Sequence, residues 1–229
     1  RVAAIINHKA NERWNCKSVR FGWIDFIDDR EVSKALLQAV EDYGKSKGMD
    51  NVVGPLGFTD MDPEGMLTWG FDQLGTMPTI YNYSYYPEHI EALDGYEVDN
   101  KYVEYKLIVP DTVPEKYAKI AAMIEKRYNL HVRKLTKKDV FQGGYGQKIF
   151  ELINATYKDL YGYSELSQKQ IDQYIHSYLR FLDFNLITCI EDWSEAEHKM
   201  VGIGITIPSL AKALQKCRRG RLLPFGWWP

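Results

Sequence analysis

The sequence has few cysteines, no long apolar run and almost no net charge. Its three cysteines (Cys16, Cys189 and Cys217) lie far apart and show no metal-ligand spacing, so we expect neither a disulfide framework nor a bound metal. No apolar stretch approaches the roughly 20 residues that span a bilayer, and we therefore expect no membrane partner. A formal net charge of -2 offers nucleic acid no bulk attraction. With so few cysteines, the expected location is the reducing cytoplasm, and we expect a small-molecule substrate as the partner.

The composition is that of an ordinary globular protein. Hydrophobic residues make up 45% of the 229 positions and charged residues 26%, which suits one large domain or two small ones. A local basic cluster near the C-terminus is interpreted as a solvated helix end; it comprises Lys212, Lys216, Arg218, Arg219 and Arg221. No signal peptide is visible, but the chain opens within an apparent strand, so Arg1 need not be its natural start. No pattern indicates an oligomeric state.

Apolar periodicity predicts a mixed α/β fold in which helices flank mostly antiparallel sheets. Short apolar or alternating runs predict strands at 2–7, 19–27, 51–54, 102–109, 130–135, 185–191 and 199–207. Helical spacing predicts helices at 29–47, 87–93, 114–128, 145–160 and 167–181. Residues 7–11 are interpreted as a polar break. The segment 108–115 is short and contains two prolines, so we divide the chain there into domains 1–110 and 111–229.

The stretch 55–80 is irregular, with three prolines and four carboxylates but no periodicity. A long irregular loop in a compact domain is usually either functional or disordered. This one contains Phe58, Trp69 and Phe71, which make it too apolar for disorder. We therefore predict an ordered loop that packs over a cleft.

A family resemblance rests on three motifs and on the order of the elements. The motifs are GPLGFTDMDPEGML (54–67), YYPEHIEALDGYE (85–97) and LLPFGWW (222–228). The three motifs together resemble those of largely uncharacterised bacterial GNAT-like proteins. The order of the predicted elements makes the first half similar to the later part of a GNAT-type acyl-CoA N-acyltransferase domain. The second half resembles the beginning of another such domain. This tandem layout is similar to that of Fem-type peptidyltransferases. The resemblance implies an N-acyltransferase that uses an amine acceptor and, as a possible cofactor, acyl-CoA.

The chain departs from the GNAT pattern where acetyl-CoA would bind. That family places a glycine-rich loop before a helix, where backbone N–H groups hold the diphosphate. Here residues 26–32 read FIDDREV, with no glycine and with the carboxylates of Asp28, Asp29 and Glu31. Two like charges at 4 Å repel by roughly 1–4 kcal/mol. We therefore expect an atypical or degenerate CoA site in the first half.

Acyl transfer to an amine needs a base for the amine proton and an acid for the leaving group. We take Asp25, Asp60 and Asp62 as candidate catalytic bases, weighed beside Asp28 and Glu64, and Tyr85 as the candidate acid. The candidate substrate-binding residues are aromatic or polar side chains near the long loop: Asn7, Phe58, Trp69, Tyr83 and Tyr86. Two structural alternatives remain open. The tyrosines could serve packing alone, and Asp60–Gly65 could be an ordinary turn.

The sequence is consistent with two functions. The first is an N-acyltransferase with an atypical acyl donor site. The second is a non-catalytic GNAT-like module that binds a small ligand or a protein through aromatic residues, which the missing phosphate loop favours. Binding to nucleic acid through the basic C-terminal cluster is a weaker third possibility, because the net charge is close to zero.

Overall fold

The computed structural model describes residues 1–76, 79–194 and 196–217. The described residues form two compact units. Unit 1 contains 1–102, 160–164 and 209–217, whereas unit 2 contains Val103–Asp159 and Glu165–Pro208. The division into domains 1–110 and 111–229 stays a prediction. Arg218, Arg219, Arg221 and the motif at 222–228 lie outside the described residues.

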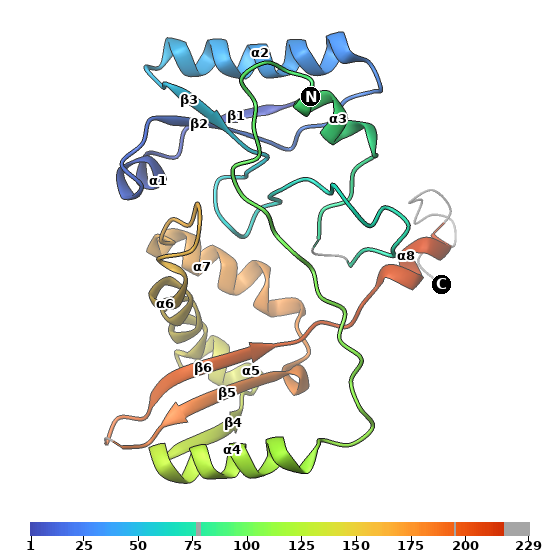
Figure 1. Cartoon of the computed structure of the whole chain (residues 1–229). Coiled ribbons are helices and arrows are strands. Elements are labelled where there is room, and N and C mark those ends of the chain that lie inside the picture. The colour runs from blue at the N-terminus through green and yellow to red at the C-terminus, as the bar shows by residue number, and fades with distance from the viewer. Residues whose placement is uncertain (77–78, 195, 218–229) are drawn as a thin grey trace. The chain divides into compact units, whose positions relative to one another are not determined.

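Unit 1 is built on a three-stranded sheet in the order β1-β2-β3. The central strand β2 pairs antiparallel with β1 and parallel with β3, and α2 lies along one face of the sheet (Figure 1). The elements of this unit are β1 (Ala3–Ile5), α1 (His8–Arg13), β2 (Ser18–Gly22), α2 (Arg30–Ser46), β3 (Asn51–Val53), α3 (Tyr85–Glu91) and α8 (Ala211–Lys216).

The two faces of β2 serve different purposes. Val19 and Phe21 are buried with Leu37 and Val40 of α2, and together they form the apolar core of the unit. Because side chains alternate along a strand, Arg20 points to the face opposite α2. Arg20 is nevertheless only 6% exposed. The loops that cover this second face therefore enclose a charged side chain.

The sequence explains where helix α2 begins and ends. The side chain of Asp29 accepts hydrogen bonds from the backbone N–H groups of Glu31 and Val32, which caps the first turn. Leu37 and Val40 recur at helical spacing and bury one face. The helix stops before Gly48, whose φ of +75° suits a residue without a side chain. The predicted helix at 29–47 is confirmed.

Unit 2 contains an antiparallel sheet in the order β4-β5-β6. Figure 1 shows α4 along one side of this sheet and α6 and α7 on the other. Its elements are α4 (Glu115–Tyr128), β4 (Leu130–Lys134), α5 (Lys137–Phe141), α6 (Tyr145–Tyr157), α7 (Gln168–Ser177), short 3-10 helices at Leu179–Phe181 and Phe184–Leu186, β5 (Ile187–Asp192) and β6 (Lys199–Ile205).

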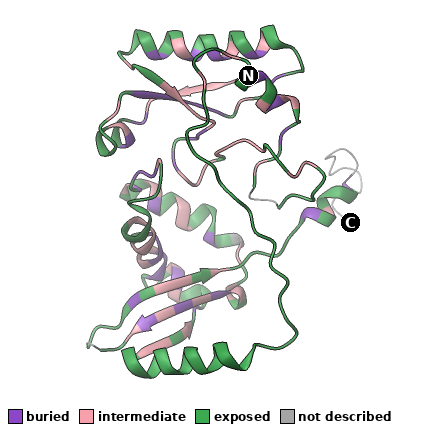
Figure 2. Ribbon diagram, in the orientation of Figure 1, coloured by how far each residue is buried: buried purple, intermediate pink, exposed green. Residues whose placement is uncertain are grey.

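The core of unit 2 lies between the sheet and helices α6 and α7. Ile149 and Phe150 of α6 pack there with Ile187, Cys189 and Met200 from the strands. Helix α4 differs, because none of its residues is buried and it is exposed along its length (Figure 2). The core is therefore one-sided.

The predicted fold class, a mixed α/β protein with mostly antiparallel sheets flanked by helices, is confirmed. One predicted strand is wrong: residues 102–109 form neither strand nor helix, and Tyr105 and Ile108 are 79% and 90% exposed. Alternating residues form a stable strand only beside a hydrogen-bonding neighbour, and no described strand pairs with this segment. The polar break at 7–11 is also wrong, since His8–Arg13 form α1 and Asn7 caps it.

Candidate functional site

The most unusual group in unit 1 is the buried guanidinium of Arg20 on β2. Its Nη1 donates to the backbone oxygens of Gly57 at 3.2 Å and Phe58 at 3.4 Å. Its Nη2 donates to the backbone oxygen of Gly162 at 2.8 Å. Among the described residues, no carboxylate lies within 4.0 Å of it. The charge is therefore held by backbone carbonyls of two distant segments and not by an ion pair.

The first of these segments is a tight loop between β3 and α3. The Asp62 carboxylate accepts hydrogen bonds from the backbone N–H groups of Phe58 and Thr59, each at 2.9 Å. The N–H of Gly65 donates to the backbone oxygen of Pro55 and closes the loop. A side chain at Gly57 would place its Cβ 2.1 Å from that of Asp62, so only glycine permits this close approach. Asp62 thus holds the carbonyls that Arg20 uses.

The same loop places two further carboxylates within electrostatic reach of Arg20. Burial raises the pKa of Glu64 to about 7, the neighbouring charge of Asp60 adds to the rise, and Arg20 opposes it. Burial also raises the pKa of Asp60, with Arg20 again opposing. Burial lowers the pKa of the guanidinium, while Asp60 and Glu64 counteract this effect. Glu64 therefore changes protonation state near neutral pH.

The second segment, 160–164, is held within unit 1 by the side chains of Asn7 and Trp14, which flank α1, and by Arg20 of β2. Trp14 Nε1 donates to the backbone oxygen of Tyr163 at 2.9 Å, and Asn7 Nδ2 donates to Ser164 Oγ at 3.1 Å. The Tyr161 hydroxyl donates to the carboxylate of Asp99. Tyr161 also lies within electrostatic range of Arg20 and Tyr102. We call Arg20, Asp60, Glu64, Tyr102 and Tyr161 the Arg20 cluster.

A second polar group surrounds Phe26 and the start of α3. The Tyr86 hydroxyl accepts from the backbone N–H of Phe26 at 3.2 Å and donates to Asp25 Oδ1 at 2.8 Å. The Tyr85 hydroxyl donates to the backbone oxygen of Phe26 at 2.8 Å, and its ring stacks on that of Tyr83. These contacts fix α3 to the segment that follows β2.

A serine, a histidine and an aspartate also form a line between α2 and α3. Ser33 Oγ lies 3.0 Å from His89 Nδ1, and His89 Nε2 lies 3.0 Å from Asp28 Oδ1. Ser33 is only 1% exposed, and its hydroxyl also donates to the backbone oxygen of Arg30. A nucleophile must be reachable by its substrate. This arrangement therefore docks α3 on α2 and offers no accessible serine.

The predicted site residues fall into two groups and one outlier. Asn7, Phe58, Asp60 and Asp62 lie at the loop around Arg20. Asp25, Tyr83, Tyr85 and Tyr86 lie around Phe26. Trp69 is 86% exposed and joins neither group. Their catalytic and binding assignments stay predictions.

Sequence reasoning missed Arg20 and gave too little weight to Glu64. A signal for Arg20 existed, because a charged residue interrupts the apolar run of strand 19–27. Glu64 stood among several loop carboxylates, and only the structure separates it from Asp62: Asp62 accepts two backbone hydrogen bonds, whereas Glu64 has a raised pKa. Nothing in the local sequence singles out Tyr161, which reaches the cluster through tertiary structure.

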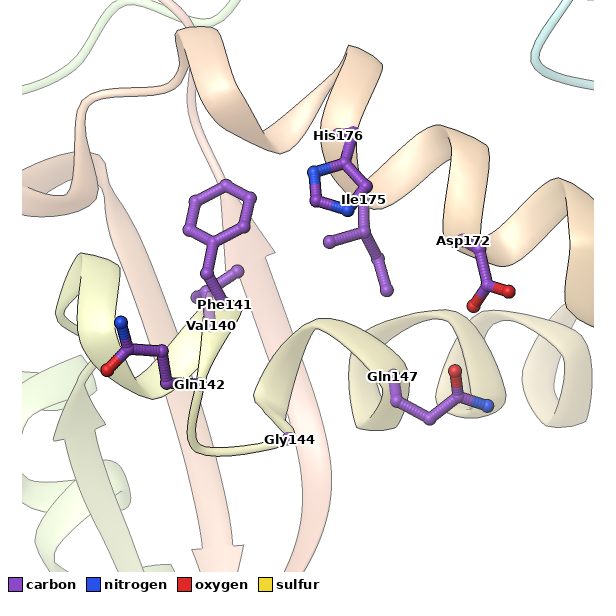
Figure 3. Close-up of a pocket in the computed structure, with 8 residues that line it drawn as sticks. All are labelled: Val140, Phe141, Gln142, Gly144, Gln147, Asp172, Ile175 and His176. Carbon is purple, nitrogen blue, oxygen red and sulfur yellow. The ribbon is translucent and has the colours of Figure 1, made fainter.

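Unit 2 contains a separate open cavity of about 350 Å³, and Figure 3 shows the side chains around it. Phe141, Ile175 and His176 form its apolar and aromatic wall, while Gln147 and Asp172 lie at one end. Gln168 hydrogen-bonds both of these polar residues. Since Gln147 and Asp172 already have a partner, they offer a ligand less than the Arg20 cluster does.

The start of α2 does not fit the diphosphate of CoA. The Asp29 side chain already occupies the amide groups of Glu31 and Val32, and its negative charge would repel a phosphate there. In the described part of the chain, no three His, Cys, Asp or Glu side chains come together as metal ligands would. No helix among the described residues has both the length and the apolar character needed to cross a membrane.

Comparisons with known proteins add two relatives. No known protein family and no solved structure matches the chain significantly. A protein of Caulobacter vibrioides named bacterial ceramide synthase is 27% identical over 210 residues, which cover 90% of this chain and 52% of that protein. Protein YghO of Escherichia coli is 35% identical over 96 residues, 42% of this chain and 24% of its own length. The chain thus spans about half of the first relative and is similar to it over nearly its whole extent.

Proposed function

We propose that this chain is part of an N-acyltransferase that joins an activated acyl group to the amino group of a long-chain amino alcohol. The substrate class is suggested by the similarity, over 90% of the chain, to a protein named bacterial ceramide synthase. A ceramide is the amide of a fatty acid with a long-chain amino alcohol. The proposal also retains the GNAT-like tandem arrangement, since the order β1-α1-β2-α2-β3-α3 in unit 1 is compatible with it.

One observation supports this chemistry above all: Glu64 has a pKa of about 7 beside Asp60 and Arg20. A general base works best when its pKa lies near the pH at which the enzyme operates. A glutamate at its ordinary pKa of 4.5 is a far weaker base. Glu64 is thus the best-suited base in the cluster, with Asp60 beside it to raise its proton affinity.

The proposed reaction is an addition to the acyl carbon followed by an elimination. The lone pair of the neutral amine forms a C–N bond with the acyl carbon, and the carbonyl electron pair moves to the oxygen. The amine then loses one proton to Glu64. The tetrahedral intermediate collapses, the bond to the leaving group breaks, and the leaving group takes the proton from Glu64. Glu64 thus acts as the base in the first proton transfer and as the acid in the second.

One observation, the capped start of α2, favours a second function, that of a non-catalytic binding module. Because Asp29 occupies the amide groups that a diphosphate would need, unit 1 offers no CoA site there. A non-catalytic module that binds an amine or another small ligand at the acidic loop would explain this equally well. Proposed partners are small molecules in either case.

We also propose the cytoplasm as the location. Cys16, Cys189 and Cys217 are all free thiols, which is typical of reducing compartments.

The test is product formation by the intact protein. Acyl thioesters of several chain lengths are incubated with a long-chain 2-amino alcohol, and the amide is measured by mass spectrometry. We expect amide formation that is lost in Asp60→Asn and Glu64→Gln variants whose melting temperatures are no lower than that of the wild type. Binding of the amino alcohol without any amide product would favour the non-catalytic module.

A further inference from the structure

Burial of the Arg20 guanidinium costs free energy of folding, which a role in the reaction would explain. Arg20 is only 6% exposed, and a charged side chain buried to this extent loses most of its hydration. Three backbone carbonyls compensate part of this cost, but they could be satisfied by neutral donors. Such a group in a cluster with a perturbed carboxylate is typical of a functional site.

Two of the five N–H groups of Arg20 have no acceptor. Nη1 uses its two hydrogens on Gly57 and Phe58, and Nη2 uses one on Gly162. In the described part of the chain, Nε–H and the second Nη2–H meet no partner. Every fully buried side-chain nitrogen or oxygen of the described residues does have one. Nε is therefore in contact with solvent, and a donor of the buried guanidinium is open to a ligand.

We propose that Arg20 is a catalytic residue whose free N–H groups stabilise the oxyanion of the tetrahedral intermediate. The inference rests on the proposed function. Before the reaction, Asp60 and the ionised Glu64 both lie within range of the guanidinium charge. When Glu64 takes the proton from the amine, one of these two negative charges disappears. At the same moment, negative charge appears on the acyl oxygen. Arg20 is thus least neutralised when the oxyanion forms.

The geometry around Arg20 is already fixed before a substrate binds. Its carbonyl partners belong to the Asp62-capped loop and to the segment 160–164, each anchored by further hydrogen bonds. A donor that is held in place costs no reorganisation when the charge develops, which is the basis of oxyanion stabilisation by enzymes. Arg20 therefore acts chiefly on the transition state and little on substrate binding.

The first experiment separates these two effects in the intact protein. Arg20→Lys keeps one positive charge but removes the Nε–H and the planar group. We expect kcat for amide formation to fall roughly 10²–10³-fold while KM changes by less than about threefold. Arg30→Lys is the matched control, because it makes the same substitution at an exposed position of unit 1. A raised KM with unchanged kcat, or an equal fall of kcat in both variants, overturns the proposal.

A second measurement uses the wild-type protein and so does not depend on the folding of a variant. An alkyl phosphonamidate carries an anionic oxygen on a tetrahedral phosphorus, as the intermediate does on carbon. We expect the nuclear magnetic resonance signal of the Arg20 Nε–H to shift on its addition, and not on addition of the neutral amide product. Binding that leaves this signal unchanged, or no binding, contradicts the role of Arg20. The proposed function fails by a different result, namely wild-type protein that makes no amide.

Discussion

Glu64 holds its proton up to about neutral pH although the guanidinium of Arg20 lies within electrostatic range. Burial and the charge of Asp60 outweigh the attraction of Arg20, which forms no ion pair with either carboxylate among the described residues. A direct ion pair would have lowered the pKa of the carboxylate and made it a poor base. Because Arg20 and Glu64 do not form an ion pair, Glu64 keeps a pKa that suits a general base.

The raised pKa of Glu64 predicts a pH-dependent stability. The folded protein keeps a proton that the unfolded chain loses at its ordinary pKa of 4.5. This contribution to stability is complete below about pH 4.5 and is lost as the pH rises through about 7. Between about pH 5 and about pH 8, we therefore expect Glu64→Gln to gain melting temperature relative to the wild type. Glu97→Gln, at an exposed position of the same unit, should show no such trend.

Asp62 is expected to act on the loop and not on the proton. Its carboxylate accepts two backbone hydrogen bonds, so Asp62→Ala should lower the free energy of unfolding by about 1–2 kcal/mol. Asp62→Asn keeps an acceptor oxygen and should cost less than half of that. Urea unfolding measures both. If instead both variants kept full stability and lost all turnover, Asp62 would belong to the catalytic machinery.

Tyr86 is expected to be structural. Tyr86→Phe removes the acceptor of the Phe26 N–H and the donor to Asp25, and should destabilise the protein by about 1–3 kcal/mol. Tyr83→Phe is a suitable control, because Tyr83 is 63% exposed. A surface change of this kind normally shifts stability by less than about 0.5 kcal/mol. Equal stability of the two variants would contradict the structural assignment of Tyr86.

Unit 2 has its own buried carboxylate, Glu191, with the opposite pH response. Burial alone would raise its pKa, but hydrogen bonds from Tyr145 and Trp193 and the charge of Arg133 together lower it. Its contribution to stability is therefore present above the ordinary pKa of 4.5 and is lost as the pH falls through the lower, folded value. We expect Glu191→Gln to flatten the acid side of the curve of stability against pH, as followed by circular dichroism. A curve for Glu191→Gln that matches the curve of an exposed Glu165→Gln control would refute this.

The sequence predicted those elements whose causes are local. Asp29 as a cap, the apolar spacing of Leu37 and Val40 and the stop near Gly48 define α2 without tertiary information. The antiparallel pair β5 and β6 follows from two apolar runs with a turn between them. Residues 102–109 show the limit of this reasoning, since alternation predicts a strand but cannot supply its neighbour.

The site could be predicted only in part, for the same reason. The acidic loop was visible as a dense run of carboxylates, and Asp60 was among the chosen residues. Which carboxylate has a raised pKa and which accepts backbone hydrogen bonds depends on how the loop packs, so Glu64 and Asp62 could not be told apart. Arg20 and Tyr161 lie 141 positions apart, and no local pattern connects them.

The pH dependence of kcat/KM for amide formation, measured on the intact wild-type protein and on Glu64→Gln, tests the account most directly. We expect the wild-type rate to rise tenfold per pH unit at low pH and to level off at about pH 7, where Glu64 becomes ionised. In Glu64→Gln, the rise of kcat/KM with pH should disappear, together with most of the activity. A wild-type kcat/KM that already levels off near pH 4.5 would contradict the assignment of Glu64 as the base. So would a Glu64→Gln variant with the same pH profile of kcat/KM as the wild type.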